Sequence, residues 1–215
     1  MDILNQTLFK GIDKKDAEDF IKSSFVNRKT FEKETFILTS GNFASSLGII
    51  LSGKIYIINE DFWGNRTIIS EIGTGDIFAE SYACIPDEPL SVSAVAAEKT
   101  EILFLDVRTV ISAQAPSCKV QAAIIKNLLT ILAKKNILLT RKMEHISKRT
   151  TREKLLSYLS SQSVKYNSSS FVIPFNRQQL ADYLSVDRSA MSNELCKLRD
   201  EGLLSFNKNH FELKQ

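Results

Sequence analysis

Residues 176–202 read NRQQLADYLSVDRSAMSNELCKLRDEG, and this pattern predicts two short helices joined by a tight turn. We expect the first helix over Arg177–Leu184 and the second over Arg188–Glu201, with residues 185–187 as the turn. Apolar residues on one side of each helix are spaced to pack together, and the small Ala181 lets the helices cross closely. The stretch therefore predicts a helix-turn-helix unit, with a plain helical hairpin as the alternative.

The second of these helices begins with side chains suited to the edges of DNA bases. Arg188 can bond bidentately to guanine, Asn193 can do the same with adenine, and Ser189 can take either role. Arg177 begins the first helix, where a phosphate contact is expected. For each residue, the alternative is an ordinary solvated side chain. The candidate DNA-binding residues are Arg177, Gln178, Arg188, Ser189, Ser192 and Asn193.

The residues on either side complete this unit. Gly202 is expected to end the second helix, and residues 203–213 have the pattern of a β-hairpin. Ahead of the unit, we expect a helix over Thr151–Ser161 and, after a polar stretch, a short strand over Phe171–Phe175. The sequence therefore predicts a winged-helix DNA-binding domain over residues 147–215.

Charge divides the chain into two parts. Residues 1–115 contain 11 lysines and arginines against 17 aspartates and glutamates, whereas residues 116–215 contain 17 against 8. The net charges are therefore −6 and +9, which give the +3 of the whole chain. A basic part joined to an acidic part indicates a polyanion-binding domain carried by another domain. The alternative is chance variation of the surface charge.

The acidic part begins with a helical pattern over about residues 1–30, with Asp13 as an N-cap, and then changes its periodicity. Between residues 31 and 110, short runs rich in β-branched residues alternate with turns that contain glycine, asparagine, aspartate or serine. Many short strands at close spacing are typical of a β-sandwich or barrel. We therefore expect a β-rich domain over residues 1–115.

A long helix is expected over Cys118–His145, after Pro116. It carries a wide apolar stripe, which a second copy of the chain can cover by coiled-coil-like packing. The alternative is that the helix packs only on its own β-rich domain. We assign residues 116–146 to a dimerisation helix and hinge. The candidate interface residues are Ile124, Leu128, Ile131, Leu132 and Leu138.

Composition and motifs exclude several classes of protein. The 215 residues are 43% hydrophobic and 25% charged, which is ordinary globular chemistry. No apolar run approaches the roughly 18 residues of a membrane span. Three widely separated cysteines, Cys84, Cys118 and Cys196, indicate a reducing, cytoplasmic setting, and a buried structural role is expected for Cys84.

Enzyme chemistry has no basis in this sequence. The two histidines, His145 and His210, lie outside the β-rich part, so a clustered-histidine metal site is not expected there. No Ser-His-Asp set, P-loop or dinucleotide-binding glycine pattern is present. We therefore expect no enzyme and assign no catalytic or metal-ligating residue, and we expect His145 to be a partly exposed surface side chain.

The order of β-rich domain, long helix and winged helix resembles the Crp–Fnr family of bacterial transcription regulators, over nearly the whole chain. The C-terminal part is similar to a Firmicutes-type branch. The resemblance implies an α+β fold, with an antiparallel β-roll (a double-stranded β-helix like cyclic-nucleotide-binding domains) ahead of the winged helix. The matching segments are residues 8–12, 51–55, 75–80, 151–155 and 187–192, together with the turn at Gly64.

The resemblance also implies partners. A homodimer with the long helix as its two-fold seam would place two recognition helices in successive major grooves of a near-palindromic operator. RNA polymerase is a further partner if the protein is an activator. An effector bound in the β-roll would reorient the DNA-binding heads.

Whether that effector is a cyclic nucleotide depends on the family's phosphate-binding cassette. Glu80 stands where the family holds the ribose, but Ala79 replaces the usual glycine. The arginine that holds the phosphate corresponds to Leu90, ahead of Ser91, and a leucine cannot neutralise a buried phosphate. Of the adenine-contacting hydroxyl pair, only Thr140 remains beside Leu139. Candidate effector-binding residues are Gly75, Phe78, Glu80, Tyr82, Leu90, Ser91, Leu139 and Thr140.

Other effectors are constrained in the same way. The oxygen-sensing branch needs a cysteine cluster for an iron–sulfur centre, and no cysteine precedes Cys84. The haem-dependent branch needs an axial histidine in the sensor, which neither histidine supplies. No cofactor is therefore expected, and the effector is an apolar or weakly acidic small molecule, or none. We expect a homodimeric, DNA-binding transcription regulator; the alternative is a ligand-sensing module that acts on a protein partner.

Overall fold

The structure, a computed structural model, describes residues 7–22, 26–61, 63, 66–85, 87–111 and 118–214. The chain forms two compact units, residues 1–133 and 134–215, which are described separately. The division falls inside the long helix α4 (Cys118–Ile146), so each unit includes part of it. None of the described helices is long and apolar enough to cross a membrane.

The first unit begins with a short 3-10 helix, η2 (Thr7–Phe9), and α1 (Lys14–Ile21), with Asp13 at its N-cap. The expected helical pattern up to residue 30 is wrong at its end, because Val26–Phe31 form strand β1. This strand pairs with β8 along its whole length, so a partner distant in sequence determines its conformation. Residues 1–6 and 23–25 lie outside the described part of the chain.

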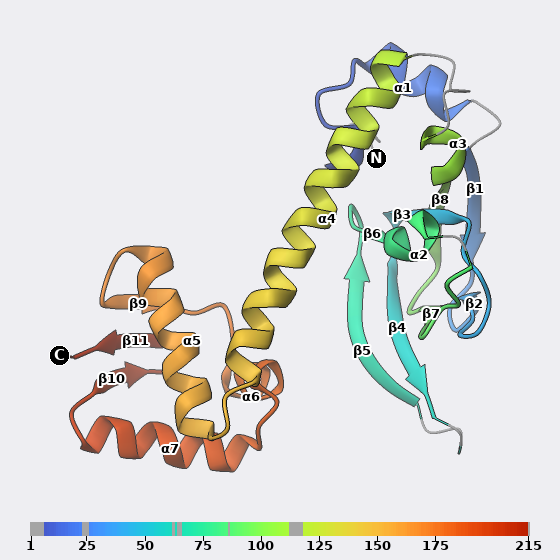
Figure 1. Cartoon of the computed structure of the whole chain (residues 1–215). Helices are drawn as coiled ribbons and strands as arrows, with labels where there is room; N and C mark the ends of the chain where they lie inside the picture. Colours follow the sequence, from blue (N-terminus) through green and yellow to red (C-terminus); the bar gives the residue numbers. More distant parts are fainter. Residues whose placement is uncertain are drawn as a thin grey trace. The chain divides into compact units, whose positions relative to one another are not determined.

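Eight strands of the first unit form two four-stranded antiparallel sheets (Figure 1). The strand orders are β1-β8-β3-β6 and β2-β7-β4-β5. This confirms the β-rich domain, with a roll of two sheets rather than one. The short helices α2 (Glu80–Cys84) and α3 (Val107–Ile111) follow β6 and β8. The further strands are β2 (Phe36–Leu38), β3 (Ser46–Ser52), β4 (Lys54–Glu60), β5 (Arg66–Gly73), β6 (Ile77–Phe78), β7 (Ser93–Ala96) and β8 (Thr100–Asp106).

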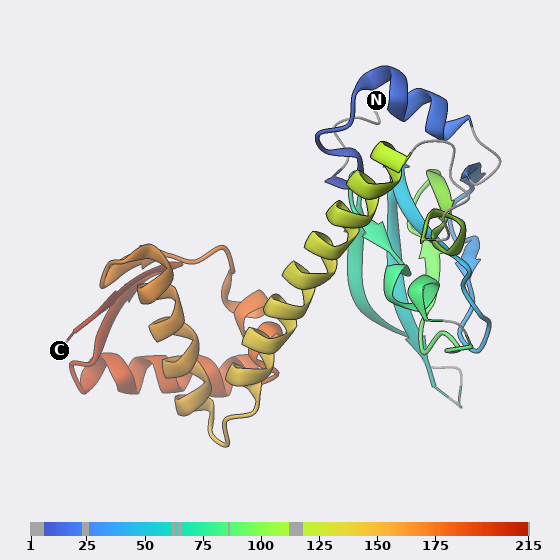
Figure 2. The same ribbon diagram turned by 45° about the horizontal axis from the view of Figure 1, so that its top comes forward.

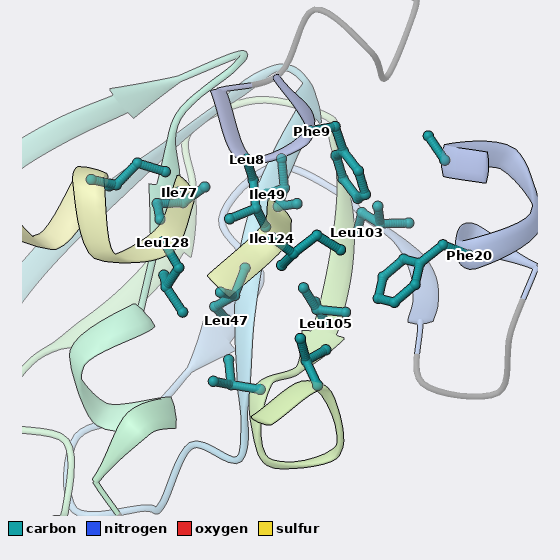
Figure 3. Packing of buried hydrophobic residues seen from close by; sticks show 14 of the residues in the cluster. Leu8, Phe9, Phe20, Leu47, Ile49, Ile77, Leu103, Leu105, Ile124 and Leu128 are labelled. Carbon is teal, nitrogen blue, oxygen red and sulfur yellow. The ribbon is translucent and has the colours of Figure 1, made fainter. Parts of the chain in front are cut away.

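The larger core lies between the first sheet and the helices. Alternate residues of β3 and β8 point to η2, α1 and the start of α4, because successive side chains of a strand face opposite sides. Asn127 of α4 fixes this helix to η2 by donating to the carbonyls of Leu8 and Lys10, at 2.8 and 2.9 Å. The labelled side chains of Figure 3 form this cluster: Leu8, Phe9, Phe20, Leu47, Ile49, Ile77, Leu103, Leu105, Ile124 and Leu128.

A second core fills the space between the two sheets. Its fully buried members are Ile50, Ile55, Phe78, Ala94 and Ile102, which come from both sheets. The ring of Phe78 lies directly against Gly48 of the neighbouring strand, where a side chain would overlap it. The inner space of the roll beside Phe78 is therefore occupied by the protein's own side chains.

Gly48→Ala is expected to destabilise the first unit by roughly 1–3 kcal/mol, because the added methyl group overlaps the Phe78 ring and the packed core must shift. The free energy of unfolding, from urea titration, measures this. Gly73→Ala is the matched control, since a methyl group there meets no described atom within 4 Å. Equal losses for the two variants would contradict the close packing at Gly48.

The second unit contains the end of α4, three further helices and a three-stranded sheet (Figure 2). α5 runs over Thr151–Tyr166, five residues longer than expected, and a capping box between Thr150 and Glu153 begins it. α6 (Arg177–Leu184) and α7 (Arg188–Asp200) match the expected helix-turn-helix. The strands are β9 (Ser170–Val172), β10 (Leu204–Asn207) and β11 (His210–Leu213), in the order β10-β11-β9.

The core of this unit holds the helix-turn-helix together. Buried residues of α6 and α7 pack on each other and on α5, and the expected contact residue Ala181 is fully buried. Phe171 of β9 and Phe211 of β11 close the same core from the sheet. The β10–β11 hairpin is thus attached to the helices, as in a winged helix. The buried helical residues are Leu155, Tyr158, Leu159, Leu180, Ala181, Leu184, Met191, Leu195 and Leu198.

Candidate nucleic-acid interface and β-roll site

The first turn of α7 is held by Asp187, its N-cap. The Asp187 carboxylate accepts a hydrogen bond from the Ala190 amide at 2.9 Å and another from the Ser189 hydroxyl. These bonds lower the pKa of Asp187, the Ser189 hydroxyl bond contributing most. A charged carboxylate at a helix N-terminus satisfies amides that the helix leaves free. The cap therefore fixes the position of the residues that begin α7.

One side of α7 is exposed, and it carries the candidate residues. Arg188, Ser189 and Asn193 are exposed, opposite the buried side of Met191, Leu195 and Leu198. Ser192 differs, because its half-buried hydroxyl donates to the Arg188 carbonyl at 2.8 Å. The structure thus places Arg188, Ser189 and Asn193 on an open helix face, and it directs the Ser192 hydroxyl to the helix backbone.

Two residues on this face were missed. Cys196 and Lys197 are exposed one turn beyond Asn193, at the i+3 and i+4 positions that share a helix face. The same spacing rule, applied past Asn193, would have identified them from sequence. Lys197 lies 3.8 Å from the half-buried Glu194 carboxylate, so part of its charge is already balanced.

Arg177 has aromatic neighbours that the sequence did not predict. Its guanidinium lies over the ring of Phe206 at 4.7 Å and over that of Phe211 at 5.1 Å. Burial lowers the pKa of Arg177, although an arginine stays charged at any physiological pH. Arg177 therefore ties the start of α6 to the β10–β11 hairpin, and its contact with a DNA phosphate remains a prediction. Gln178 is exposed and donates to Asp182 at 2.8 Å.

A cavity of about 490 Å³ lies between the start of α6 and the turn of the β10–β11 hairpin. Arg177 and Gln179 line it from α6, and Lys208 and Asn209 line it from the turn. Asn209 fixes that turn, since its amide donates to the Ile173 carbonyl at 3.2 Å. Lys208 is exposed with a positive φ of 53° and adds a cation at the hairpin tip that sequence reasoning did not single out.

α5 holds α7 through an ion-pair network. The guanidinium of Arg152 bonds to Glu194 of α7 at 3.3 Å and to both carboxylate oxygens of Glu201, directly after the helix. These bonds raise the pKa of Arg152 and lower that of Glu201. The bidentate geometry fixes the angle between the two helices. The network therefore orients α7 without using its exposed face.

His145, near the end of α4, is buried rather than partly exposed, which corrects the expectation. Only 3% of its surface is exposed, and its ring lies 5.7 Å from that of Tyr158 and 6.3 Å from that of Tyr183. Its Nδ1 lies 2.9 Å from the Ser157 hydroxyl of α5. The side chain therefore fixes the last turn of α4 to α5 and α6. The sequence had no clear signal of this, because the aromatic partners are distant along the chain.

Protonation of His145 is expected to destabilise the second unit. Burial lowers the pKa of His145 below 6.5, and nearby Lys148 adds to this, while Glu144 opposes it. Above pH 6.5 the histidine is neutral in both states, so its contribution to stability is complete. As pH falls below 6.5, the unfolded chain takes up the proton first, so stability decreases until the lowered native pKa is passed. The free energy of unfolding between pH 7.5 and 5 measures this.

The matched control for this prediction uses the other histidine. His145→Gln removes the titrating group, so the part of the pH dependence between pH 7.5 and 5 that His145 causes should disappear. His210→Gln, at an exposed position, should leave that dependence as it is in the native chain. If His145→Gln keeps the full pH dependence, another group causes it.

In the first unit, the cassette residues surround the start of α2. Glu80 is buried at the first position of α2, directly after Ala79 in the left-handed conformation, with φ 58°. That backbone favours glycine, the residue that the resemblance implies at this position. Gly75 has φ 97°, and its amide donates to the Ile50 carbonyl at 2.9 Å. The turn geometry of the cassette is therefore present.

The structure brings only some of the predicted effector-binding side chains close to one another. The hydroxyls of Tyr82 and Ser91 share a hydrogen bond of 2.6 Å, beside the buried Leu90. Phe78 is 2% exposed and belongs to the core between the sheets, so its assignment as a contact for an effector is corrected. Leu139 and Thr140 are exposed residues of α4 in the second unit.

The predicted interface stripe on α4 also needs correction. Ile124, Leu128 and Ile131 are only 1%, 6% and 8% exposed, because they pack into the core of the first unit. They therefore cannot form the contact with a second copy. Leu132 is half-buried against the same core, and Leu138 is 63% exposed. The alternative that α4 packs on its own β-rich domain is thus correct for this series.

A second apolar series, offset by one residue, lies beside the first. It repeats with spacings of three and four residues, the pattern of positions a and d in a coiled coil. Three of its members are open: Leu129 and Leu139 are both 62% exposed, and Met143 is 65% exposed, whereas Ile125 and Leu132 are half-buried against the core of the first unit. We call this series the α4 seam: Ala122, Ile125, Leu129, Leu132, Asn136, Leu139, Met143 and Ile146.

Among the described residues, no group of three or more His, Cys, Asp or Glu side chains could hold a metal ion. Cys84 is half-buried, and burial, followed by the nearby Glu80 carboxylate, raises the pKa of its thiol. A raised pKa favours the protonated thiol, which is the less reactive form. The structural role of Cys84 remains a prediction.

Two family models match the chain. The cyclic nucleotide-binding domain matches residues 28–114, and the Crp-like helix-turn-helix domain matches residues 153–215. Among curated proteins, the cyclic AMP receptor protein of Thermus thermophilus is 26% identical over 98 residues. The match covers 46% of this chain, and it spans 44% of the length of that relative.

Solved structures with a similar fold cover nearly the whole chain. The c-di-GMP-responsive global regulator CLP of Xanthomonas campestris is 19% identical with a TM-score of 0.54, over 94% of this chain and 100% of that one. CprK complexed with OCPA is 16% identical with a TM-score of 0.59, over 91% and 88%. These likenesses concern the fold, and they confirm the expected order of β-roll, long helix and winged helix.

Proposed function

The chain belongs to the Crp family of transcription regulators, with a cyclic nucleotide-binding-like sensor domain ahead of a DNA-binding helix-turn-helix domain, and from this we propose that it acts as a homodimer on a near-palindromic operator. Two recognition helices related by a two-fold axis read two half-sites about one helical turn apart. A small molecule bound in the β-roll changes the DNA affinity of the dimer, and RNA polymerase is the further partner if the regulator is an activator. No catalytic activity is part of this function.

The observation that supports this proposal most directly is the exposed side of α7. Arg188, Ser189 and Asn193 offer hydrogen-bonding groups matched to base edges, on a helix whose start and angle are fixed by Asp187 and Arg152. The hairpin tip adds Lys208, next to the cavity that Arg177 lines. Base-reading residues on α7, with a cation on the hairpin and another at the start of α6, are the expected composition of a DNA interface.

The α4 seam supports the dimer. Leu129, Leu139 and Met143 are large apolar side chains that are more than half exposed, on one face of one helix. A second copy of the same helix, packed in parallel, would cover them by knobs-into-holes packing. The exposed residues repeat at heptad spacing, and a second copy of α4 has the same repeat. It therefore fits this face better than an unrelated partner does.

The cassette supports an effector other than a cyclic nucleotide. Leu90 is buried where a cation would have to meet the phosphate, and Ser91 is already hydrogen-bonded to Tyr82. A phosphate placed there would lose water without gaining a positive partner, which is costly. Cyclic AMP is therefore expected not to alter DNA binding.

Selection of sequences from a random duplex DNA pool by the purified full-length protein tests the proposal. Recovery of an inverted repeat, with half-sites about one helical turn apart, is the expected result. Recovery of a single half-site would contradict the dimer. The absence of any enrichment, with or without extracts that contain metabolites, would contradict DNA reading and favour a module that acts on a protein partner.

A further inference from the structure

The first turn of α7 contains a hydroxyl group whose hydrogen already has a partner. Ser189 is exposed on the same face of α7 as Arg188 and Asn193. Its Oγ atom donates a hydrogen bond to Oδ1 of Asp187, the N-cap of the helix. An ionised carboxylate has no hydrogen to give, so the serine must be the donor of this bond. The direction of the Ser189 O–H bond therefore follows from the charge of Asp187.

The Asp187 carboxylate is charged, and the helix backbone also holds it in place. The Oδ1 atom that accepts from Ser189 also accepts from the Ala190 amide at 2.9 Å. The pKa of Asp187 is lowered, first by the Ser189 hydroxyl and then by the Ala190 amide, so the group is ionised at neutral pH. A hydrogen bond to a charged acceptor is roughly twice as strong as one to a neutral acceptor. The Ser189 hydrogen is therefore firmly directed to Asp187.

This bond leaves only one hydrogen-bonding role for the Ser189 hydroxyl at a DNA base. A serine hydroxyl has a single hydrogen and two lone pairs, so the exposed Oγ atom can still accept. In the major groove, guanine and thymine present only acceptors, whereas adenine and cytosine present an exocyclic amino group that donates. To donate to guanine or thymine, Ser189 would have to exchange a charge-assisted bond for a neutral one. The hydroxyl is therefore suited to adenine or cytosine.

We propose that Asp187 is a positioning residue for base reading: it fixes the hydrogen of Ser189, so that Ser189 accepts a hydrogen bond from the amino group of adenine or cytosine. This inference rests on the proposed DNA reading by α7 and narrows it, because the sequence alone allows Ser189 to donate or to accept. The neighbouring Arg188 has only donors. Two successive residues of α7 therefore address base edges of opposite polarity.

The base pair that Ser189 reads is located by selection from a random duplex DNA pool. The native full-length protein and Ser189→Ala are compared, and the variant should lose its preference at one base pair in each half-site. Every base pair has one exocyclic amino group and one purine N7 in the major groove. In the selected duplex, purine in place of adenine or pyrimidin-2-one in place of cytosine removes the amino group. A 7-deaza base removes the N7 atom.

Fluorescence anisotropy with these duplexes, each modified in one half-site, measures which group Ser189 contacts. Removal of the amino group should weaken binding of the native protein about three- to tenfold more than binding of Ser189→Ala, the range expected for one hydrogen bond. Removal of the N7 atom should affect the two proteins equally. Because each comparison uses the same duplex, any weakening of the base pair itself cancels.

Asp187→Asn tests the part played by the carboxylate. Asparagine is as good an N-cap as aspartate, so α7 should keep its start, but a neutral amide no longer fixes the Ser189 hydrogen. The variant should bind all duplexes more tightly, because a negative charge is lost, and it should accept guanine or thymine at the Ser189 base. In the Ser189→Ala background, Asp187→Asn should change the overall affinity only, because Asp187 acts through Ser189.

Asn176→Asp is the matched control, because Asn176 caps α6 in the same way and accepts from the Gln179 amide at 2.9 Å. It changes the charge of a cap but no hydroxyl of α7, so every base preference should stay as in the native protein.

Three results would each overturn the proposal: no effect of the amino group that depends on Ser189, an effect of the N7 atom that does, or an equal effect of Asp187→Asn on all sequences. If the native protein still selects an inverted repeat, the assigned role of Asp187 fails alone. If it selects no sequence, the proposed DNA reading fails together with it.

Discussion

Leu139→Glu is expected to dissociate the dimer and to weaken operator binding strongly, whereas Leu138→Glu leaves both nearly unchanged. Leu139 belongs to the α4 seam, and the proposed dimer would bury two copies of it. Loss of two buried leucines costs roughly 3–6 kcal/mol, which corresponds to an increase of about 10²–10⁴ in the dimer dissociation constant. Two apposed glutamates add repulsion to this loss.

The two positions are closely matched. Leu138 and Leu139 are 63% and 62% exposed in the single chain, and both belong to α4. The substitution by glutamate is the same at the two positions. They differ in the series to which they belong, since Leu138 continues that of Ile124, Leu128 and Ile131, whose members are buried in the first unit. Any difference between the variants therefore reports which side of α4 meets the second copy.

Sedimentation velocity over a range of concentrations measures the dissociation constant, and fluorescence anisotropy with the selected duplex measures DNA binding. Circular dichroism of each variant checks that α4 remains helical. Dissociation by Leu138→Glu but not by Leu139→Glu would show that the seam is wrongly placed. A dimer that survives both substitutions would show that α4 is not the interface.

Arg188→Ala is expected to weaken operator binding and to relax the preference at one base pair in each half-site. The exposed guanidinium begins α7, and a bidentate contact with a guanine is worth about 1–3 kcal/mol of discrimination. Two half-sites double this value, so the affinity for the full operator falls by about 30-fold or more. Binding to unrelated DNA should change far less.

Arg188→Lys separates base reading from charge. Lysine keeps the charge but lacks the planar fork of donors, so it should remain as unselective as alanine at that base pair. Selection from a random duplex pool with each variant gives the preference directly. If lysine restores full affinity, or if alanine weakens binding to all sequences equally, Arg188 contacts a phosphate instead.

The helix-turn-helix could be predicted from sequence because its signals are local. Asn176 and Asp187 are the N-caps of the two helices, and each accepts a hydrogen bond from the backbone amide three residues later. The buried residues of both helices repeat at helical spacing. β1 could not be predicted in the same way. Its residues alternate weakly in polarity, and their strand conformation depends on pairing with β8, whose paired residues lie 69 to 79 positions later in the chain.

The candidate sites were predictable to different degrees. Arg188, Ser189 and Asn193 lie on an exposed helix face as expected, because helical periodicity determines which residues share a side. The two apolar series of α4 are not distinguishable by periodicity, since both follow the same repeat, offset by one residue. Only the packing against Leu8 and Ile77 shows which series the chain itself covers.

Asn136 interrupts the α4 seam with an amide between Leu132 and Leu139. If two parallel copies of α4 pack without a shift, their two Asn136 amides meet and can hydrogen-bond to each other. If the copies are shifted or antiparallel, each Asn136 amide is instead buried against leucine. A single asparagine at such a position reduces stability but selects one alignment and one number of strands. In the proposed dimer, Asn136 would therefore favour an unshifted pair of chains, and only such a pair can place two recognition helices symmetrically on an inverted repeat.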